Sequence, residues 1–380
     1  MYTITLPRRV ASLSPTHLSS MVLSISLLGD SLLYLILPVA AIQFGISPLW
    51  IGILLSVNRF IRLGVNYALV PLVSRIGLHG LAIMGAILAT ISTLAYGILI
   101  GGVALLIARV VWGIAFAALR LTTLSYATAD PETAGKELGV STSIIAIAPF
   151  LVLTVGATAT QWIGERHIFI VLGVLTTLSI GLALKLPNDI PARENIAVFR
   201  KPKHEDWIIF IATFGSDGVF VVSLSALLLA EGYAAGTAIQ IGGAILAGRR
   251  LSNIVLAPFL GRLADRWGMR RLFGVALLLL TAGFGLMGIG VGLVGAILTL
   301  IGGSATMTLA PGIAAEGAGE ERVLALASVS TWRDLGAAFG ALFAGSLLSE
   351  FGVYPLFLGI GVVVLVAMVH FGVYYQSPKL

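Results

Sequence analysis

Long apolar runs, separated by short polar or glycine-containing turns, follow one another along the whole chain. A helix that crosses a bilayer needs about 20 predominantly apolar residues. Runs of that kind predict twelve spans, which cover 18–43, 49–72, 79–101, 103–128, 138–162, 167–186, 207–231, 236–261, 271–291, 294–315, 324–349 and 353–375. Four prolines interrupt long spans and are expected to bend them: Pro38, Pro149, Pro258 and Pro311. The pattern predicts an all-α membrane protein.

The longest polar connection divides the predicted helices into two sets of six. We expect an N-terminal bundle at 1–186, a central cytoplasmic loop at 187–206 and a C-terminal bundle at 207–380. Two six-helix halves related in parallel are typical of transporters, with the substrate site between the halves at the middle of the bilayer.

An offset of 191 residues relates polar positions in the two halves. It places Ser74-Arg75 on Asp265-Arg266 and Gly77 on Gly268. The alternative is chance similarity among apolar helices, but the match falls on charged residues rather than on leucines. The match therefore favours an internal repeat.

Composition excludes several other classes of protein. The chain is 58% hydrophobic and only 11% charged, and its mean hydropathy of +1.03 lies far from the soluble norm. The net charge of +6 is spread over short loops, which argues against a nucleic-acid partner. Cysteine is absent, and we expect no metal site, no cofactor and no catalytic residue. The first apolar run is too long for a cleaved signal.

Lysine and arginine are distributed unevenly between the two sides of the predicted bundle. With the N-terminus inside, Arg166 alone lies outside, whereas fifteen basic residues lie inside: Arg8, Arg9, Arg75, Lys136, Lys185, Arg193, Arg200, Lys201, Lys203, Arg262, Arg266, Arg270, Arg271, Arg322 and Lys379. By the positive-inside rule, both termini are expected to be cytoplasmic. The expected location is the plasma (inner) membrane.

Two motifs give the chain a resemblance to the major facilitator superfamily. Residues 261–271 (GRLADRWGMRR) resemble the loop signature of that family, and residues 109–118 (RVVWGIAFAA) resemble its fourth-helix motif. The first-half copy of the loop signature has Ser74 where the family usually has an acid. The resemblance points nearest to the drug or metabolite:proton antiporter branch, although Ala148-Pro149-Phe150 lacks the Gly-Pro-x-x-Gly-Gly pattern of that branch.

Charged residues inside the predicted spans are the candidates for function. There are ten of them: Asp30, Arg59, Arg62, Arg109, Arg120, Asp217, Arg249, Arg250, Arg333 and Asp334. Insertion scales assign roughly 2.5–3.5 kcal/mol to one such group at a helix centre, so most must face a wet cavity or pair with one another. Each is therefore a functional candidate.

Asp30 and Asp217 lie near the centres of the first and seventh spans and are candidates for proton coupling. The resemblance implies a role for Asp30, because a first-helix acid is common in proton-coupled members. It also implies a proton relay through Arg109, which matches the arginine of the fourth-helix motif. The alternative is a static ion pair that fixes helix packing.

Five arginines are expected to contact substrate, namely Arg120, Arg59, Arg62, Arg249 and Arg250. A guanidinium stays charged and binds carboxylate or phosphate in a bidentate manner. Seven arginines against three aspartates within the spans favour anionic or zwitterionic solutes. The alternative is that Arg120 only neutralises Asp30, and that some of the other four arginines pair with Asp334 or cap helix ends.

Gating residues are expected in the loop signature and its counterparts. They are Gly261, Asp265, Arg266, Gly268, Arg270, Arg271, Arg75, Arg333 and Asp334. Arg333-Asp334 opens the eleventh predicted helix, just before the G-x-x-x-G spacing of Gly336 and Gly340 that lets helices approach closely. Because Ser74 replaces the acid, the two halves are expected to close unequally.

The sequence thus predicts a monomeric multi-pass secondary transporter that moves a small organic solute by alternating access. Coupling to protons and efflux of a drug or metabolite are the first expectation, and uptake or exchange of an organic anion without protons is the alternative. No nucleotide-binding loop of the form G-x-x-x-x-G-K-[ST] is present, which argues against ATP drive. A lipid-modifying enzyme and a non-transporting sensor are more remote alternatives.

Overall fold

The computed structural model describes residues 13–38, 40–188 and 200–376, which form helices and no strand. The first half contains α1 (Pro15–Ile36), α2 (Pro48–Ala68), α3 (Val70–Ile98), α4 (Gly102–Ala127), α5 (Ala134–Ile163) and α6 (His167–Ala183). The second half contains α7 (His204–Thr213), the π-helical turn η1 (Phe214–Val219), α8 (Phe220–Ala230), α9 (Ala235–Trp267), α10 (Met269–Gly288), α11 (Gly292–Ala315), the 3₁₀ turn η2 (Gly319–Glu321), α12 (Arg322–Phe351) and α13 (Val353–Gln376).

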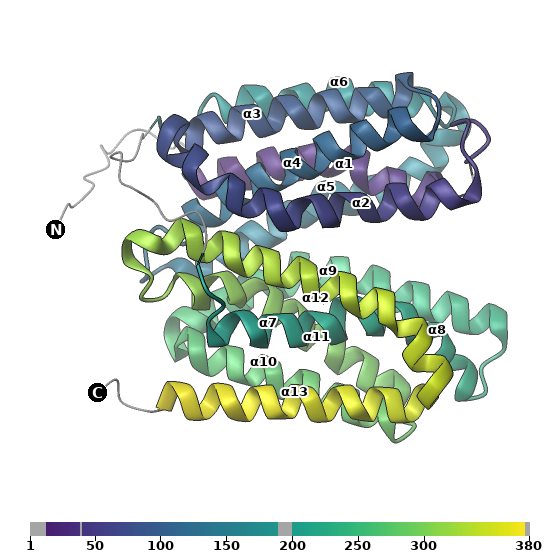
Figure 1. Ribbon diagram of the computed structural model, residues 1–380, viewed down its shortest axis with the longest axis vertical. Helices are drawn as coiled ribbons and strands as arrows, with labels where there is room; N and C mark the ends of the chain where they lie inside the picture. The colour runs from purple at the N-terminus through teal and green to yellow at the C-terminus, as the bar shows by residue number, and fades with distance from the viewer. Residues whose placement is uncertain (1–12, 39, 189–199, 377–380) are drawn as a thin grey trace.

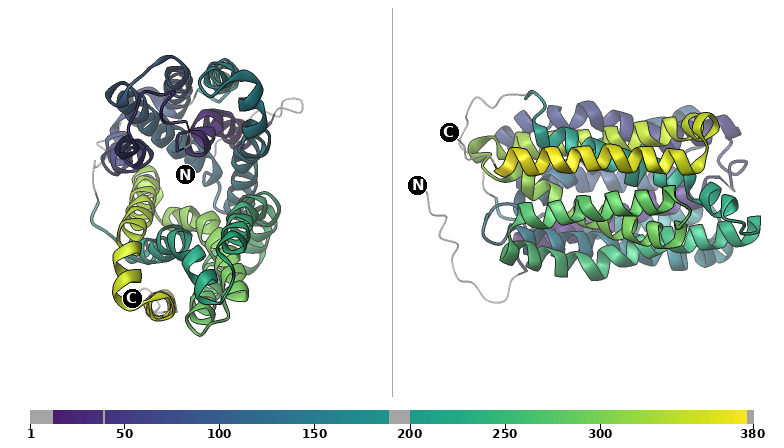
Figure 2. Two further views of the ribbon diagram at one scale, coloured as in Figure 1. Left: turned by 90° about the vertical axis from the view of Figure 1, so that its right-hand side faces the viewer. Right: turned by 90° about the horizontal axis from the view of Figure 1, so that it is seen from below.

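The helices run roughly parallel to one another, across the longest axis of the molecule, and form two groups that are stacked along that axis (Figure 1). Helices α1–α6 lie together above α7–α13, and the end-on view in Figure 2 shows the same separation. The start of α1 and the end of α13 lie at the same end of the molecule, which we call the terminal end. The turns after α1 and before α9 lie at the opposite, far end. The division into domains at 187–206 remains a proposal, and residues 189–199 of that loop lie outside the described residues.

Eight helices of the described chain are long and apolar enough to cross a membrane. Helix α6 is apolar but shorter. The other long helices, α2, α9 and α12, carry the charged residues Arg59 and Arg62, Arg249 and Arg250, and Arg333 and Asp334. The count of twelve spans and the cytoplasmic position of the termini remain predictions. Arg8, Arg9, Arg193 and Lys379, which contributed to the predicted orientation, lie outside the described residues.

One helix end differs from the predicted spans in an instructive way, and the turn between the second and third spans falls in the predicted gap. Helix α1 ends at Ile36 instead of continuing to residue 43, because Pro38 has no N–H with which to extend the hydrogen-bond ladder. The expectation that Pro38 bends a continuing helix is therefore wrong, whereas Pro149, Pro258 and Pro311 do lie inside helices. The reversal between the second and third spans occurs at Gly77, with φ 70° and ψ 174°, inside a segment that is otherwise helical.

The glycines that the 191-residue offset pairs have similar backbone conformations. Gly77 has φ 70° and Gly268, between α9 and α10, has φ 94°. Both values lie in a region that glycine adopts easily and other residues avoid. The repeat is thus expressed as two sharp turns at the terminal end, one in each half.

Buried apolar clusters hold each group together and join the two groups at one end. One cluster consists of second-half residues around Phe220, Phe273 and Phe284, and another of first-half residues around Phe44 and Phe169. A third cluster brings Leu69, Val70 and Leu138 of the first half against Leu324 and Leu326 of α12. The apolar contact between the halves is therefore located at the terminal end.

Candidate functional site

The first candidate pair joins Asp30 of α1 to Arg109 of α4. Arg109 Nη1 donates to Asp30 Oδ1, and Arg109 Nε donates to the Leu54 carbonyl oxygen at 2.7 Å. Arg109 also donates to the hydroxyl oxygens of Tyr96 at 3.3 Å and Tyr34 at 3.4 Å. The Arg109 side chain is fully buried, whereas that of Asp30 is 13% exposed. The guanidinium is thus fixed from several sides, and the carboxylate is the accessible partner.

The second pair joins Asp217 to Arg249 and lies in the other half. Asp217 belongs to the π-helical turn between α7 and α8, and Arg249 Nη2 donates to its Oδ1. The Ser216 hydroxyl donates to the same oxygen at 3.4 Å. Both charged side chains are about one-fifth exposed, at 19% and 21%. Both members of this pair are therefore partly exposed, whereas Arg109 in the first pair is not.

The two pairs correspond in their acids but not in their arginines. Asp30 and Asp217 lie on the first long helix of each half, as the sequence predicts. Arg109, however, lies on α4, whereas Arg249 lies on α9, which the 191-residue offset aligns with α2. Arg250 is exposed and is close enough to both Asp30 and Asp217 for the charges to interact. Arg250 therefore lies between a charged group of each half, without an ion pair to either acid in the described residues.

A third group of charges bridges the halves. Arg62 Nε of α2 donates to Asp334 Oδ2 of α12 at 2.7 Å, and Arg333 Nη2 donates to Asp334 Oδ1 at 3.0 Å. The Arg62 guanidinium carbon lies 4.6 Å from the centre of the Phe116 ring. The prediction that Arg333-Asp334 opens its helix is wrong. Helix α12 begins at Arg322, and the pair lies three turns inside it. It is an interior contact between halves.

Two predicted substrate residues have no ion-pair partner in the described chain. Arg120 of α4 is half-buried, and its Nε is buried without a hydrogen-bond acceptor among the described residues. Arg59 of α2 is also half-buried. Since Asp30, Asp217 and Asp334 are all paired with other arginines, the span charges leave Arg59, Arg120 and Arg250 without a dedicated carboxylate.

The loop signature contacts the opposite half through Asp265 near the end of α9. Its Oδ1 accepts from the Gly135 N–H and its Oδ2 from the Lys136 N–H, both at 2.8 Å. These N–H groups belong to the first turn of α5, so Asp265 caps a helix of the other half. Gly261 packs one turn away, where a Cβ would overlap the Gly135 carbonyl oxygen. Asp265 and Gly261 therefore lie where a gating contact would be.

The remaining members of the signature lie at the surface. Arg270 Nε donates to Glu316 at 2.9 Å within the second half, and both side chains are well exposed. Arg266, Arg271 and Gly268 are exposed, as is Arg75 in the first-half copy. Ser74 donates to the Pro71 carbonyl oxygen of its own helix at 2.7 Å and makes no contact like that of Asp265.

Residues that the sequence did not single out complete the contact at the terminal end. Arg322 at the start of α12 donates to the Thr128 and Ala129 carbonyl oxygens, at 3.0 and 3.1 Å, where α4 ends. This basic side chain binds helix C-terminal carbonyls, whereas Asp265 binds helix N-terminal N–H groups. Gly139 of α5 similarly faces the α9 backbone at Ala257. Single loop charges and glycines carry no sequence signal that would distinguish them from the many others.

A buried polar chain connects three further helices. The Tyr67 hydroxyl of α2 donates to Ser328 Oγ of α12 at 3.1 Å, and Ser328 donates to Asp206 Oδ1 of α7 at 3.0 Å. Asp206 is fully buried and also accepts from Arg200 Nη2 at 3.0 Å. All the hydrogen bonds described here between the halves lie between the middle of the helices and the terminal end. The terminal end is closed in this structure.

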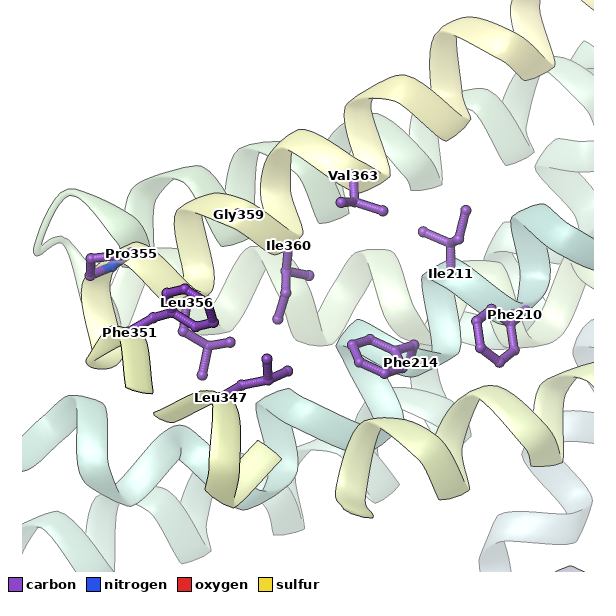
Figure 3. Close-up of a pocket in the computed structure, with 10 residues that line it drawn as sticks. All are labelled: Phe210, Ile211, Phe214, Leu347, Phe351, Pro355, Leu356, Gly359, Ile360 and Val363. Carbon is purple, nitrogen blue, oxygen red and sulfur yellow. The ribbon is translucent and has the colours of Figure 1, made fainter. Parts of the chain in front are cut away.

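Two cavities lie away from these charges. An apolar groove of about 450 Å³ runs between α7, α12 and α13 and is lined by side chains that include Phe210, Phe214 and Ile360 (Figure 3). A more polar hollow of about 520 Å³ lies at the far end of the second half, beside Glu231 and Tyr354. Neither contains a member of the three ion-paired groups, so the candidate site is defined by its charges.

The chain is similar to known proteins in part of its sequence and in its fold. Residues 206–379 match the model of the Major Facilitator Superfamily. The fold is similar to that of the human organic anion transporter MFSD10 (TETRAN), with a TM-score of 0.75 and 14% identity over 94% of this chain and 98% of that one. It is also similar to the E. coli fucose:proton symporter FucP, with a TM-score of 0.76 and 14% identity over 96% of this chain and 99% of that one. A structure of the Major Facilitator Superfamily transporter FucP in the outward conformation has a TM-score of 0.77 and 13% identity, over 96% of this chain and 99% of that one. Comparison with curated protein sequences finds no match.

Proposed function

We propose that this chain is a secondary active transporter of the major facilitator superfamily, which moves a small organic solute across the membrane by alternating access. Family and fold point to a transporter rather than an enzyme. The finer proposal is coupling to protons, with efflux of a drug or metabolite as the physiological direction. We place the protein in the plasma (inner) membrane as a monomer.

The observation that carries proton coupling is the Asp30–Arg109 pair. Arg109 is held by the Leu54 carbonyl and by Tyr96 independently of Asp30, so it stays in place when the carboxylate changes its charge. Asp30 is partly exposed and carries the proton-accepting oxygens. Protonation of Asp30 would cancel its attraction to Arg109 without disordering α4. Intramembrane acids in this setting are typical of proton pathways.

Asp217 and Arg250 extend this proposal to the second half. Arg250 interacts with both Asp30 and Asp217, so protonation of either acid changes the charge balance experienced by the other. The two halves must move relative to one another during alternating access. A proton on Asp30 would therefore alter an attraction between the halves, which is what coupling requires.

The sidedness of the structure follows from the predicted topology. The terminal end is closed by contacts of α5 with α9 and of α2 with α12. If the termini are cytoplasmic, as the distribution of basic residues indicates, this conformation is closed to the cytoplasm. Proton and solute would then reach Asp30 and Arg250 from the far end.

Exchange or uptake of an organic anion without protons is the second candidate. It is favoured by three arginines that have no dedicated carboxylate among the described residues, Arg59, Arg120 and Arg250. An anion could balance that charge without a proton. In this case the Asp–Arg pairs would serve only to fix helix packing.

Transport by purified protein in vesicles separates the two candidates. Vesicles loaded with a pH-sensitive dye are exposed to a panel of organic anions and lipophilic cations, and solute-dependent proton flux is recorded. We expect Asp30→Asn to abolish proton flux while solute exchange persists. The control is Glu320→Gln, which removes an exposed acid outside the spans and should behave as wild type. Solute transport by the wild type without proton flux would favour uncoupled transport, and undiminished proton flux in Asp30→Asn would exclude coupling through Asp30.

A further inference from the structure

Three arginines and one aspartate gather where α2, α4 and α12 meet. Arg62 comes from α2, Arg120 from α4, and Arg333 and Asp334 from α12. The Arg62 guanidinium carbon lies 4.6 Å from the centre of the Phe116 ring, one turn before Arg120 on α4, which places Arg120 near the other three charges. The group therefore contains side chains from both halves, and its formal charge is two positive.

The carboxylate of Asp334 is already occupied. Each of its oxygens accepts from a different guanidinium, Oδ2 from Arg62 at 2.7 Å and Oδ1 from Arg333 at 3.0 Å. Its side chain is only 6% exposed, so water contributes little further. Asp334 therefore has no accessible oxygen left with which to neutralise Arg120.

Arg120 is a cation that the described residues leave without an acceptor. Its Nε is buried and makes no hydrogen bond within the described chain. A guanidinium is taken out of water at a substantial cost unless a negative group compensates it, and two neighbouring arginines add repulsion. Such an arrangement is expected where a ligand supplies the missing negative charge.

We propose that Arg120, with Arg333 and Arg62, forms a binding subsite for the anionic end of a dianionic organic solute, such as a dicarboxylate or a phosphate monoester. Two negative charges match the formal excess of two positive charges. Planar guanidinium groups bind carboxylate and phosphate oxygens through paired hydrogen bonds. Phe116, one turn before Arg120 and in contact with Arg62, supplies an apolar wall. The inference rests on the proposed function and specifies its substrate class.

The subsite also fits alternating access. Arg62 and Arg120 belong to the first half and Arg333 to the second, so a bound dianion is held by both. It would replace repulsion among three cations by attraction to a shared anion. Binding would therefore favour approach of α12 to α2 and α4.

The test measures binding without requiring transport. The thermal unfolding midpoint of the detergent-purified full chain is recorded with succinate, inorganic phosphate, acetate or tetraphenylphosphonium at equal ionic strength. We expect succinate or phosphate to raise the midpoint saturably, and acetate and tetraphenylphosphonium to have no such effect. The stronger of the two effective ions identifies the headgroup. If neither dianion raises the midpoint of the wild type, the proposal is wrong.

Variants then locate the subsite. Arg120→Gln should weaken dianion affinity by about tenfold or more, because one charge-assisted contact is lost, and Arg120→Lys should give an intermediate loss. Lys185→Gln removes an equal charge from an exposed position and should bind as wild type. Without any dianion, Arg120→Gln should raise the midpoint, since an uncompensated cation is removed. A lowered midpoint with unchanged dianion affinity would make Arg120 structural and overturn the assignment.

Asp30→Asn separates this inference from proton coupling. That variant should retain the stabilisation by dianion even where it abolishes proton flux. Loss of flux with retained binding supports both proposals. Retained flux with retained binding removes proton coupling through Asp30 and leaves the subsite intact.

Discussion

Asp265 of α9 accepts a hydrogen bond from the Gly135 backbone N–H of α5 at 2.8 Å, and the two residues belong to opposite halves. The neighbouring Lys136 N–H binds the second oxygen of the same carboxylate. One side chain therefore caps a helix that its own half does not contain. If the terminal end opens by separation of α5 from α9, as the proposed alternating access requires, this contact is broken.

Asp265→Asn should shift the protein towards conformations that are open at the terminal end. The amide retains one acceptor oxygen but loses the negative charge that interacts with the helix N-terminus, at a cost of about 1 kcal/mol, or roughly a fivefold change in the closed-to-open ratio. The chain contains no cysteine, so spin labels at Glu132→Cys and Glu320→Cys can report the distance between halves. Glu316→Gln, which breaks a pair within one half, is the control. Identical distance distributions in Asp265→Asn and the control would argue against gating by this residue.

Gly261→Ala should oppose closure more strongly than Asp265→Asn does. The added methyl group would overlap the Gly135 carbonyl oxygen, which is backbone and cannot rotate away. Overpacking of this kind typically costs about 1–3 kcal/mol. The matched control on the same helix is Gly243→Ala, where nothing lies within 4 Å of the new atom. The same spin-label pair measures the closed-to-open ratio. Equal ratios in the two alanine variants would show that α5 and α9 are not in tight contact at Gly261.

Asp334→Asn should destabilise the protein by about 3–5 kcal/mol, because removal of one partner from a buried ion pair leaves the other charge uncompensated. Here two guanidinium groups, from Arg62 and Arg333, lose their shared carboxylate. The comparison is Glu316→Gln, since the Arg270–Glu316 pair is about 40% exposed and such surface pairs contribute about 0–1 kcal/mol. Thermal unfolding in detergent measures the stability of both variants. Similar midpoints would mean that water reaches Asp334 readily.

Arg109→Lys should reduce proton-coupled transport at least about tenfold although the positive charge is kept. Lysine has a single ammonium group and cannot bind the Leu54 carbonyl, Asp30 and Tyr96 in the fixed geometry of the guanidinium fork. Proton flux in vesicles is the measurement, with retained helicity by circular dichroism as the check on folding. Wild-type flux would indicate that charge alone suffices at this position.

Much of the helical framework follows from apolar periodicity. The predicted second-half spans begin within a few residues of the observed helices, since a membrane-length apolar run has few alternatives to helix. The turn at Gly268 was predictable from the charged, glycine-bounded loop, and its counterpart at Gly77 from the repeat. The end of α1 at Ile36 was not, because proline ends some helices and lies within others, as Pro149 does.

The pairing of charges was less predictable. The sequence indicates that intramembrane acids need partners, and it offered Arg62 only as one of four arginines that could pair with Asp334. It does not specify that Asp217 pairs with Arg249 while Asp30 pairs with Arg109, because helices of equal apolarity can be arranged around one another in several ways. The contact of Arg322 with the end of α4 depends on the positions of two loops after folding. Such contacts are decided by tertiary packing, which single-sequence patterns do not contain.

The crossing of α5 and α9 at Gly135 and Gly261 is made by main-chain atoms, with no large side chain between the helices. Dispersion contacts between backbones do not change with ionic strength, whereas attraction between exposed charges is screened by salt. Only the rim of this crossing, at Asp265, is sensitive to salt. The closeness of α5 and α9 at this crossing is therefore expected to persist when the ionic composition on that side of the membrane changes.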